Sequence, residues 1–155
     1  MILTALGTDE HPFERALDAI DPLRPAHELV VQHGHTPARD WAEVRWLDFV
    51  EFDTLLSFMR EADAIVCHAG VGTIMTVLSL GRRPVVIPRL AAYGEHVDDH
   101  QLQIFDKLTQ RGFLVPFLDG TDIEAAIEES RSGTVEWQRD SRLAEAIAAA
   151  VDGVA

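Results

Sequence analysis

The sequence predicts an α/β fold of the Rossmann-like type, an open and mainly parallel sheet with helices on both faces. Three observations lead to this prediction. Short apolar segments alternate with segments whose apolar residues recur every three or four positions. The first of the short segments, residues 1–6, is almost wholly apolar, as expected for a strand that is buried on both faces. The chain has 155 residues and is 47% hydrophobic, which predicts a single domain over residues 1–155 with a sizeable core.

The first half of the chain begins with an apolar run and then alternates helix and strand. The strands that we predict are residues 1–6, 27–32 and 44–50. A helix over residues 12–20 has a proline in its first turn, where proline is tolerated. A second helix is predicted over residues 53–60, with Asp53 as its N-cap.

The second half continues the alternation. Its predicted strands are residues 64–67, 84–87 and 113–117, and its predicted helices are residues 73–80, 99–111, 122–130 and 137–151. Gly81 and Gly112 follow two of these helices and are expected to end them, because glycine suits the left-handed conformation that closes a helix.

Residues 64–80 carry the clearest chemical signal, because an apolar strand leads through a loop with Gly70 and Gly72 into a helix. We expect the two glycines to adopt backbone angles that a side chain would forbid, so that loop amides turn toward a ligand. The first N–H groups of the helix, from Thr73, have no intrahelical partners and lie at the positive end of the helix dipole. The segment therefore predicts a site for a phosphate or diphosphate. A tight turn that binds nothing is the alternative.

Several familiar sites are not favoured. Met75 stands where the dinucleotide fingerprint needs glycine or alanine, and no Gly-Lys-Ser/Thr of a P-loop is present. His96 and His100 have the spacing of a zinc-protease helix, but Val97 stands in place of the glutamate, so no metal site is expected. There is no nucleophile elbow. The motifs therefore argue against NAD enzymes, ordinary NTPases and serine hydrolases.

The composition bounds the partners and the compartment. The net charge of −13 argues against nucleic acid or a bare anionic membrane as a partner. No apolar run reaches the roughly 18 residues of a membrane span, and the amino terminus lacks a signal-peptide pattern. Cys67 is the single cysteine, and we expect it to be a buried small residue in a reducing compartment. A cytoplasmic protein is predicted.

Three loops should meet at the carboxyl ends of the strands, where ligands of such sheets bind. They are Gly7-Thr8, residues 68–73 and residues 89–101. Gln101 opens a helix there, and its amide could bond a polar ligand. The acidic residues beside it, Glu95, Asp98 and Asp99, are interpreted as a solvated face and a helix cap, with a cation site as the alternative. His33 and His35 are expected to be exposed in a turn.

Several motifs in order resemble the carboxy-terminal domain of family 28 glycosyltransferases. They are His68-Ala69-Gly70-x-Gly72-Thr73, Gly81-x-x-Pro84 with a strand into Pro88-Arg89, Asp99-His100-Gln101, and Leu108 with Gly112. The match covers about residues 62–117, and a weaker likeness extends through Gly7-Thr8, Phe13 and Gln32-x-Gly34. The chain is most similar to short members of this family, such as the catalytic subunit of two-component N-acetylglucosaminyltransferases and bacterial exopolysaccharide counterparts.

The resemblance implies the carboxy-terminal half of a GT-B glycosyltransferase, which binds a UDP-sugar as substrate and needs no cofactor. It implies transfer of a hexosyl or N-acetylhexosaminyl group to a lipid-linked acceptor in surface polysaccharide synthesis. The loop at residues 68–73 would face the diphosphate, and residues 99–101 the sugar hydroxyls. The implied donor-binding residues are Gly7, Thr8, His68, Ala69, Gly70, Val71, Gly72, Thr73, Arg89, Glu95, Asp99, His100 and Gln101.

The chain departs from the family pattern in two ways. Thr76 stands where larger members carry a glutamate that binds the ribose, and Glu95 is a substitute from the neighbouring loop. A two-domain transferase also needs about twice this length. The acceptor-binding half is therefore expected from a membrane-anchored partner subunit, which would recruit this chain to the inner face of the plasma membrane. A homo-oligomer is left open for the isolated chain.

The resemblance also places the general base in that partner half, with His11 as the local candidate in this chain. Trp41 and Trp46 are considered as exposed aromatic contacts to the partner, although core packing is favoured for Trp46. Two other readings of the sequence stay open. One is a nucleotide-sugar-binding or regulatory module without transferase activity, and the other is a structural domain whose loop stays empty.

Overall fold

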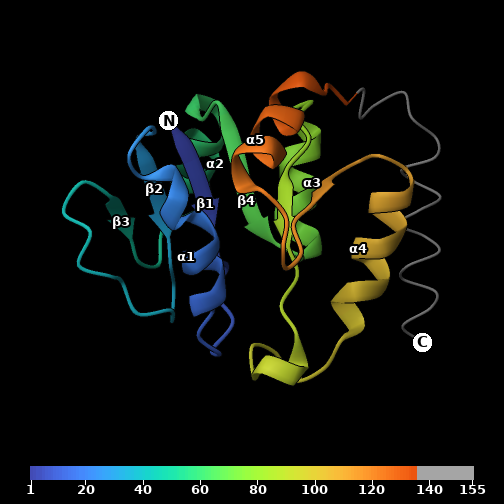
Figure 1. Ribbon diagram of the computed structural model, residues 1–155, viewed down its shortest axis with the longest axis horizontal. Coiled ribbons are helices and arrows are strands. Elements are labelled where there is room, and N and C mark those ends of the chain that lie inside the picture. The colour runs from blue at the N-terminus through green and yellow to red at the C-terminus, as the bar shows by residue number, and fades with distance from the viewer. Residues whose placement is uncertain (136–155) are drawn as a thin grey trace.

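The computed structural model describes residues 1–135 and shows a six-stranded sheet with helices on both faces (Figure 1). The strands are β1 (Ile2–Ala5), β2 (Leu29–Gln32), β3 (Arg45–Leu47), β4 (Ala64–His68), β5 (Val85–Ile87) and β6 (Val115–Pro116). The helices are α1 (Glu14–Ile20), α2 (Phe52–Glu61), α3 (Val71–Ser79), α4 (His100–Gln110) and α5 (Ile123–Ser132), with short 3-10 turns η1 (Asp21–Leu23) and η2 (Ala91–Tyr93). The predicted Rossmann-like class is confirmed.

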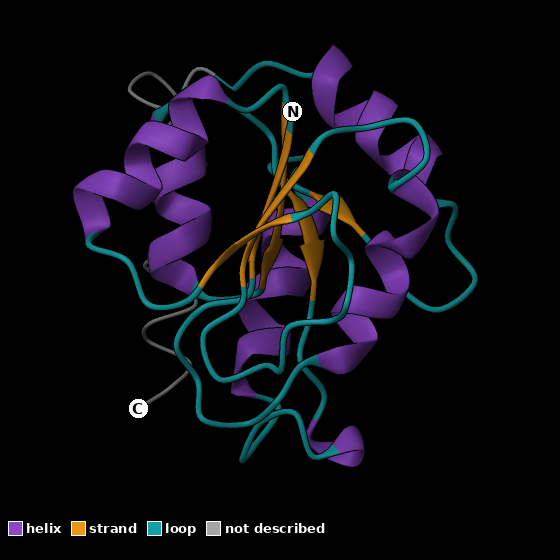
Figure 2. Ribbon diagram, turned by 90° about the vertical axis from the view of Figure 1, so that its left-hand side faces the viewer, coloured by secondary structure: helices purple, strands orange, loops and turns teal. Residues whose placement is uncertain are grey.

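The strand order is β3-β2-β1-β4-β5-β6, and every pairing is parallel. The chain builds outward from β1 to β3 and then returns to pair β4 with the other side of β1. The order therefore reverses between β1 and β4, and the carboxyl ends of these two strands are the expected place for a ligand. Figure 2 shows the loops that leave the strand arrowheads gathered at one end of the sheet.

Helices cover each face of the sheet with a separate apolar cluster. On one face α1 and α5 pack on the sheet through Leu17, Ile20 and Ile127. On the other face α2, α3 and α4 do so through Met59, Ile74 and Phe105. Neighbouring strand residues enter opposite clusters, as the two-residue period of a strand requires. The inner strands β1, β2, β4 and β5 are thus buried on both faces, which explains why they are mostly apolar, whereas β3 at the edge of the sheet is partly exposed.

The structure changes some of the predicted boundaries. The N-cap of α2 is Glu51, so the prediction of Asp53 as the cap is wrong, and Asp53 lies in the first turn. Helix α3 begins at Val71, earlier than the predicted Thr73. Gly81 and Gly112 have φ of 75° and 74° after α3 and α4, which confirms them as helix ends. The predicted helix over residues 137–151 lies outside the described residues.

Within the described part of the chain, no helix combines the length and the apolar character that crossing a bilayer would require.

Candidate functional site

The three predicted loops do meet, and a buried arginine joins two of them. Arg89, which follows β5, is 1% exposed. Its Nη1 donates to the carbonyl oxygens of His11 at 2.7 Å and Glu95 at 3.0 Å, and its Nη2 donates to that of Leu6 at 3.0 Å. The ring of Phe13 lies 4.5 Å from the guanidinium carbon. Arg89 therefore holds the loop after β1 against the loop after β5 from inside, with both terminal nitrogens in use and Nε without a partner among the described residues.

Gly7 is fixed by the strand beside it. Its N–H donates to Gln32 Oε1 at 3.1 Å, and Gln32 Nε2 donates back to the Gly7 carbonyl at 3.1 Å. Gly7 has a φ of 80°, and a Cβ on Gly34 would lie 2.4 Å from the Gly7 oxygen. Because β2 delivers both Gln32 and Gly34, the Gln-x-Gly motif explains how this turn is held. Sequence reasoning noted that motif without assigning it this role.

His68, the last residue of β4, fills the space between two glycines. A Cβ built on Gly7 would lie 2.6 Å from His68 Cε1, and one on Gly70 would lie 2.1 Å from His68 Nε2. Both positions need glycine because the imidazole occupies the space that a side chain would take. The predicted reason for Gly70 is therefore wrong, since its φ is −75° and no unusual backbone angle is involved.

The imidazole of His68 is neutral near pH 7. Burial lowers its pKa from 6.5 to about 4, while its bond to the Ala5 carbonyl opposes the change. Nδ1 lies 3.3 Å from that carbonyl oxygen. A carbonyl oxygen only accepts, so Nδ1 carries the proton and Nε2 is an acceptor. In this form His68 offers no N–H group to an anion.

The start of α3 is the open donor group of the site. Gly70 is its N-cap, and no side-chain hydrogen bond caps the helix. A Cβ on Gly72 would meet nothing within 4 Å, so the approach to the first turn is free on that side. Gly72 is not among the glycines with positive φ, so the predicted unusual angle is wrong here as well. The amides of Val71, Gly72 and Thr73 belong to the first turn and have no intrahelical acceptor.

A carboxylate lies between two histidines beside this site. Asp9 Oδ1 is 2.7 Å from Nδ1 of His11 and accepts the His11 backbone N–H at 2.9 Å. Asp9 Oδ2 is 3.4 Å from Nε2 of His96. Burial by itself would raise the pKa of Asp9, but the hydrogen bonds from His11, with Arg89 and His96 nearby, bring it below its ordinary value. Asp9 was not predicted as a site residue.

Glu95 is committed to a contact inside the protein. It is 4% exposed, and its carboxylate accepts from Arg15 Nε at 2.9 Å and Arg15 Nη2 at 2.7 Å. It also accepts the Leu90 backbone N–H at 2.9 Å. This bidentate pair favours a positioning role for Glu95 over direct contact with a ribose. Arg15, from α1, is a second residue that sequence reasoning did not foresee.

The remaining predicted site residues differ in whether their backbone or their side chain is available to the site. Ala69 is buried in the core beside α3, so only its backbone faces the site. Thr8 is exposed in the loop after β1. Asp99 is the N-cap residue of α4, as predicted, but its side chain accepts from the Ala91 backbone N–H at 3.0 Å and not from the helix. Gln101 has a buried Oε1 with no partner among the described residues, which is the kind of group a ligand could satisfy. The structure describes His100 only as the first residue of α4.

The structure also decides the expectations for two tryptophans and two histidines. Trp41 is 9% exposed in the core beside α1, so it is not the exposed aromatic contact that was considered. Trp46 packs against the same core, as favoured. His33 is not simply exposed, because its Nδ1 lies 2.7 Å from the Thr36 carbonyl and its ring meets Trp46 edge-on. His35 is exposed.

The described residues provide no metal centre, since no three of their His, Cys, Asp and Glu side chains are placed to hold an ion. The prediction for Cys67 is confirmed in that it is buried. Burial raises the pKa of its thiol to about 12, which keeps it protonated and unreactive.

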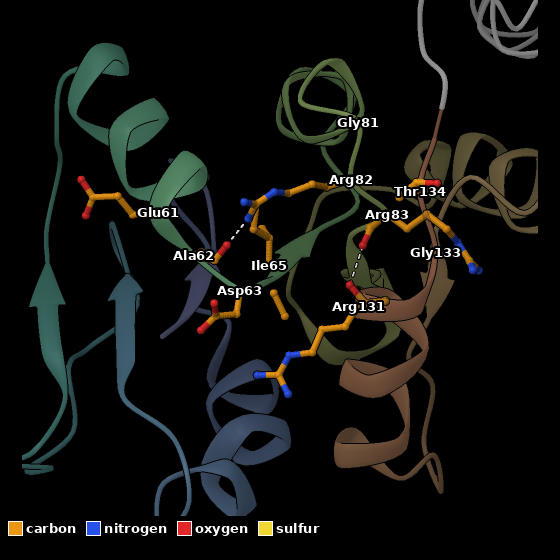
Figure 3. Close-up of a pocket in the computed structure, with 12 residues that line it drawn as sticks. Glu61, Ala62, Asp63, Ile65, Gly81, Arg82, Arg83, Arg131, Gly133 and Thr134 are labelled. Atoms are coloured by element: carbon orange, nitrogen blue, oxygen red, sulfur yellow. Dashed lines mark hydrogen bonds between the residues drawn. The ribbon is translucent and has the colours of Figure 1, made fainter.

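A pocket of about 500 Å³ lies at the opposite, amino edge of β4 and β5 (Figure 3). Three arginines line it, but each serves the protein itself. Arg82 donates to the carbonyls of Met59, Arg60 and Ala62, which end α2. Arg83 and Arg131 pair with Glu129 and Glu128 of α5. These guanidinium groups hold helix ends in place, so the pocket does not compete with the carboxyl edge as an anion site.

Comparison with known proteins agrees with the architecture. The model of the glycosyltransferase family 28 C-terminal domain matches residues 9–152. The UDP-N-acetylglucosamine--N-acetylmuramyl-(pentapeptide) pyrophosphoryl-undecaprenol N-acetylglucosamine transferase of Geobacter sulfurreducens is 39% identical over 66 residues, which are 42% of this chain and 17% of that protein. The UDP-N-acetylglucosamine transferase subunit ALG13 of Yarrowia lipolytica is 30% identical over 63 residues, 41% of this chain and 30% of that protein. The chain thus matches less than a third of either relative's length.

Two solved structures share the fold. The glycosyltransferase SnogD from Streptomyces nogalater superposes with a TM-score of 0.52 and 20% identity, over 97% of this chain and 38% of that one. The glycotransferase of kitacinnamycin superposes with a TM-score of 0.51 and 20% identity, over the same shares of the two chains.

Proposed function

The chain belongs to the glycosyltransferase family 28 C-terminal domain family, and we propose that it binds the UDP-sugar donor of a glycosyltransferase at the carboxyl edge of its sheet. The observation that carries this proposal is the start of α3. The helix opens at the switch point between β1 and β4, without a side-chain cap and with free space over Gly72. That geometry suits a diphosphate in a chain whose net charge is −13.

Backbone dipoles are well suited to this reaction. When the bond from the sugar to the diphosphate breaks, the leaving UDP gains negative charge. Amides that are already oriented toward it stabilise that charge without reorganising. The neutral His68 adds no positive charge and instead keeps Gly7 and Gly70 apart. In this proposal the amides of residues 70–73 hold the diphosphate, and Gln101 contacts the sugar through its unpaired Oε1.

The acceptor side belongs to another part of the enzyme. The matched relatives are between three and six times longer than their matched segments, and one of them is named as a transferase subunit. We propose that a membrane-anchored partner subunit binds a lipid-linked acceptor and recruits this chain to the inner face of the plasma membrane. The transferred group would be a hexosyl or N-acetylhexosaminyl residue of a surface polysaccharide. His11 is the local candidate for the base that takes the acceptor proton.

One observation favours a second function, a nucleotide-sugar-binding or regulatory module without transferase activity. Thr76 stands where larger family members carry the ribose-binding glutamate. Its hydroxyl donates to the Gly72 carbonyl at 2.7 Å, so it is occupied within the helix. Donor binding without that glutamate would lack one ribose contact.

Calorimetric titration of the purified chain with UDP and several UDP-sugars tests the binding proposal. Binding that is lost in Gly72→Val supports it, and the absence of heat with every nucleotide, in a folded chain, contradicts it. Transfer activity after co-expression with a membrane-associated protein that supplies the other half then separates the enzyme from the module. Binding without transfer in that complex supports the module.

A further inference from the structure

The loop after β1 contains a carboxylate and an imidazole in the arrangement that orients a base. His11 Nδ1 lies 2.7 Å from Asp9 Oδ1. A carboxylate accepts and does not donate, so the proton of the neutral ring lies on Nδ1 and Nε2 keeps its lone pair. The Asp9 side chain is 25% exposed and that of His11 is 31% exposed, so the pair is sheltered but reachable from solvent.

We propose that Asp9 is a positioning residue that fixes the tautomer of His11, so that His11 Nε2 takes the proton of the acceptor hydroxyl. This inference rests on the proposed transferase function and extends it by assigning the base to this chain, with Asp9 as its partner. A base held by an orienting carboxylate is a general arrangement for activating a hydroxyl group.

Two further contacts hold the pair in place, both from the loop between β5 and α4. His96, in the loop before α4, lies 3.4 Å from the second oxygen of Asp9. Arg89 Nη1 donates to the His11 carbonyl at 2.7 Å. The Asp9 carboxylate also accepts the His11 backbone N–H, which closes a tight turn around the pair. The ring therefore sits on the framework that joins the loops after β1 and β5.

The reaction step balances with these groups alone. The acceptor oxygen forms a bond to the anomeric carbon of the sugar, while the bond from that carbon to the diphosphate oxygen breaks. The leaving UDP keeps the electron pair and rests against the start of α3. The acceptor proton passes to His11 Nε2, and the resulting imidazolium is stabilised by the Asp9 carboxylate.

The matched control is a second pair of the same chemistry far from the site. His27 precedes β2, and its Nε2 lies 3.0 Å from Glu124 Oε2 of α5. There the carboxylate faces the other ring nitrogen, so His27 is expected to carry its proton on Nε2. The two histidines should therefore show opposite tautomers in one spectrum.

Nitrogen NMR of the ring nitrogens in the labelled full chain tests the inference without any need for activity. His11 signals are assigned by their loss in His11→Gln. We expect a protonated Nδ1 in His11, a shift toward the other tautomer in Asp9→Ala, and no change of His11 in Glu124→Ala. An unchanged His11 tautomer in Asp9→Ala, with the fold intact by circular dichroism, would overturn the inference.

Kinetics of the complex with the partner half give the second readout. His11→Gln should lower kcat by about 10²- to 10⁴-fold, and Asp9→Asn by about tenfold or more, with KM for the donor little changed. His27→Gln should leave kcat unchanged. A kcat of Asp9→Asn within about twofold of the wild type would contradict the role of Asp9. Failure of the isolated chain to bind any UDP compound contradicts the transferase proposal itself, whatever the tautomer of His11.

Discussion

The amino ends of the strands form one edge of the sheet and their carboxyl ends form the other. Each of these edges contains an arginine that donates to three backbone carbonyls, but the two arginines have different roles. At the amino edge, Arg82 binds the carbonyls of Met59, Arg60 and Ala62, which are close in sequence and end α2. At the carboxyl edge, Arg89 binds those of Leu6, His11 and Glu95, which come from two separate loops. Arg82 thus satisfies the free carbonyls at the end of one helix, whereas Arg89 holds two loops together.

The edges also differ in what they leave unpaired. In the pocket at the amino edge the terminal nitrogens of the guanidinium groups already hold carbonyls or carboxylates, and Arg83 Nε is a single buried donor without a partner among the described residues. Within the described residues, the carboxyl edge leaves more groups open, namely the uncapped start of α3, Gln101 Oε1 and Arg89 Nε. Buried or sheltered polar groups are normally satisfied, so open donors and acceptors indicate a place where a ligand completes the bonding. In this protein the polar groups that lack hydrogen-bond partners therefore indicate the ligand site better than the presence of a pocket does.

The largest expected effect comes from removing each arginine in turn. Arg89→Met leaves buried carbonyls without donors and should lower the free energy of unfolding by about 2–4 kcal/mol. It should also weaken nucleotide binding at least about tenfold, because the two loops lose their connection. Arg82→Met should cost about 1–3 kcal/mol, since water can reach its carbonyls, and should leave nucleotide affinity unchanged. Urea unfolding and calorimetry measure both quantities. Equal loss of affinity in the two variants would remove the distinction between the edges.

Gly72→Val should change nucleotide affinity at the carboxyl edge without changing the stability of the fold. A side chain here enters open space over the first turn of α3, so it should block access to the amides without a clash. We expect affinity for UDP to fall about tenfold, with little change in the unfolding midpoint because valine forms helix slightly better than glycine. The smaller Gly72→Ala serves as the control and should lose less affinity. Wild-type affinity in the valine variant would show that the ligand lies elsewhere.

The carboxyl edge should also give the protein a pH dependence between about pH 4 and 6.5, through His68. The pKa of His68 is about 4 in the folded chain and 6.5 in its ordinary state, so the unfolded chain binds this proton more readily. Stability from this group is present in full above about pH 6.5 and is lost as the pH falls toward 4, by at most about 1.4 kcal/mol per pH unit. Urea unfolding between these values should show a shallower slope in His68→Asn. The same slope in the variant would contradict the burial of a neutral ring.

Gln101→Ala should produce the smallest effect. Its unpaired Oε1 is proposed to contact the sugar, so its loss should alter the preference among UDP-sugars while affinity for UDP itself stays nearly constant. Calorimetry with UDP and at least two UDP-sugars measures both. Equal losses for UDP and for the sugar nucleotides would show that Gln101 does not read the sugar.

The elements of the fold could be predicted because they depend on local periodicity. The apolar runs of β1 and β4 and the switch point between them follow from burial on both faces of a parallel sheet. The failures concern contacts between segments far apart in sequence. Gly70 is required by the ring of His68, and Trp41 is buried beneath Arg24 and Arg39, neither of which a local pattern reveals.

The site shows the same division. The strand, glycine loop and helix start between residues 64 and 80 were predicted from consecutive residues. The roles of Arg89, Asp9 and Glu95 depend on which loops the sheet brings together, and the sequence places them up to 86 positions apart. Gln-x-Gly at residues 32–34 was the one local signal that could have indicated how Gly7 is held.

Amide NMR of the labelled chain during a titration with UDP tests the central claim most directly. The account predicts that the amide signals of residues 70–73 shift the most as UDP saturates, while those of Ala62, Arg82 and Arg83 at the amino edge stay in place. Saturable shifts confined to the amino edge, or no shifts at all in the folded chain, would contradict it.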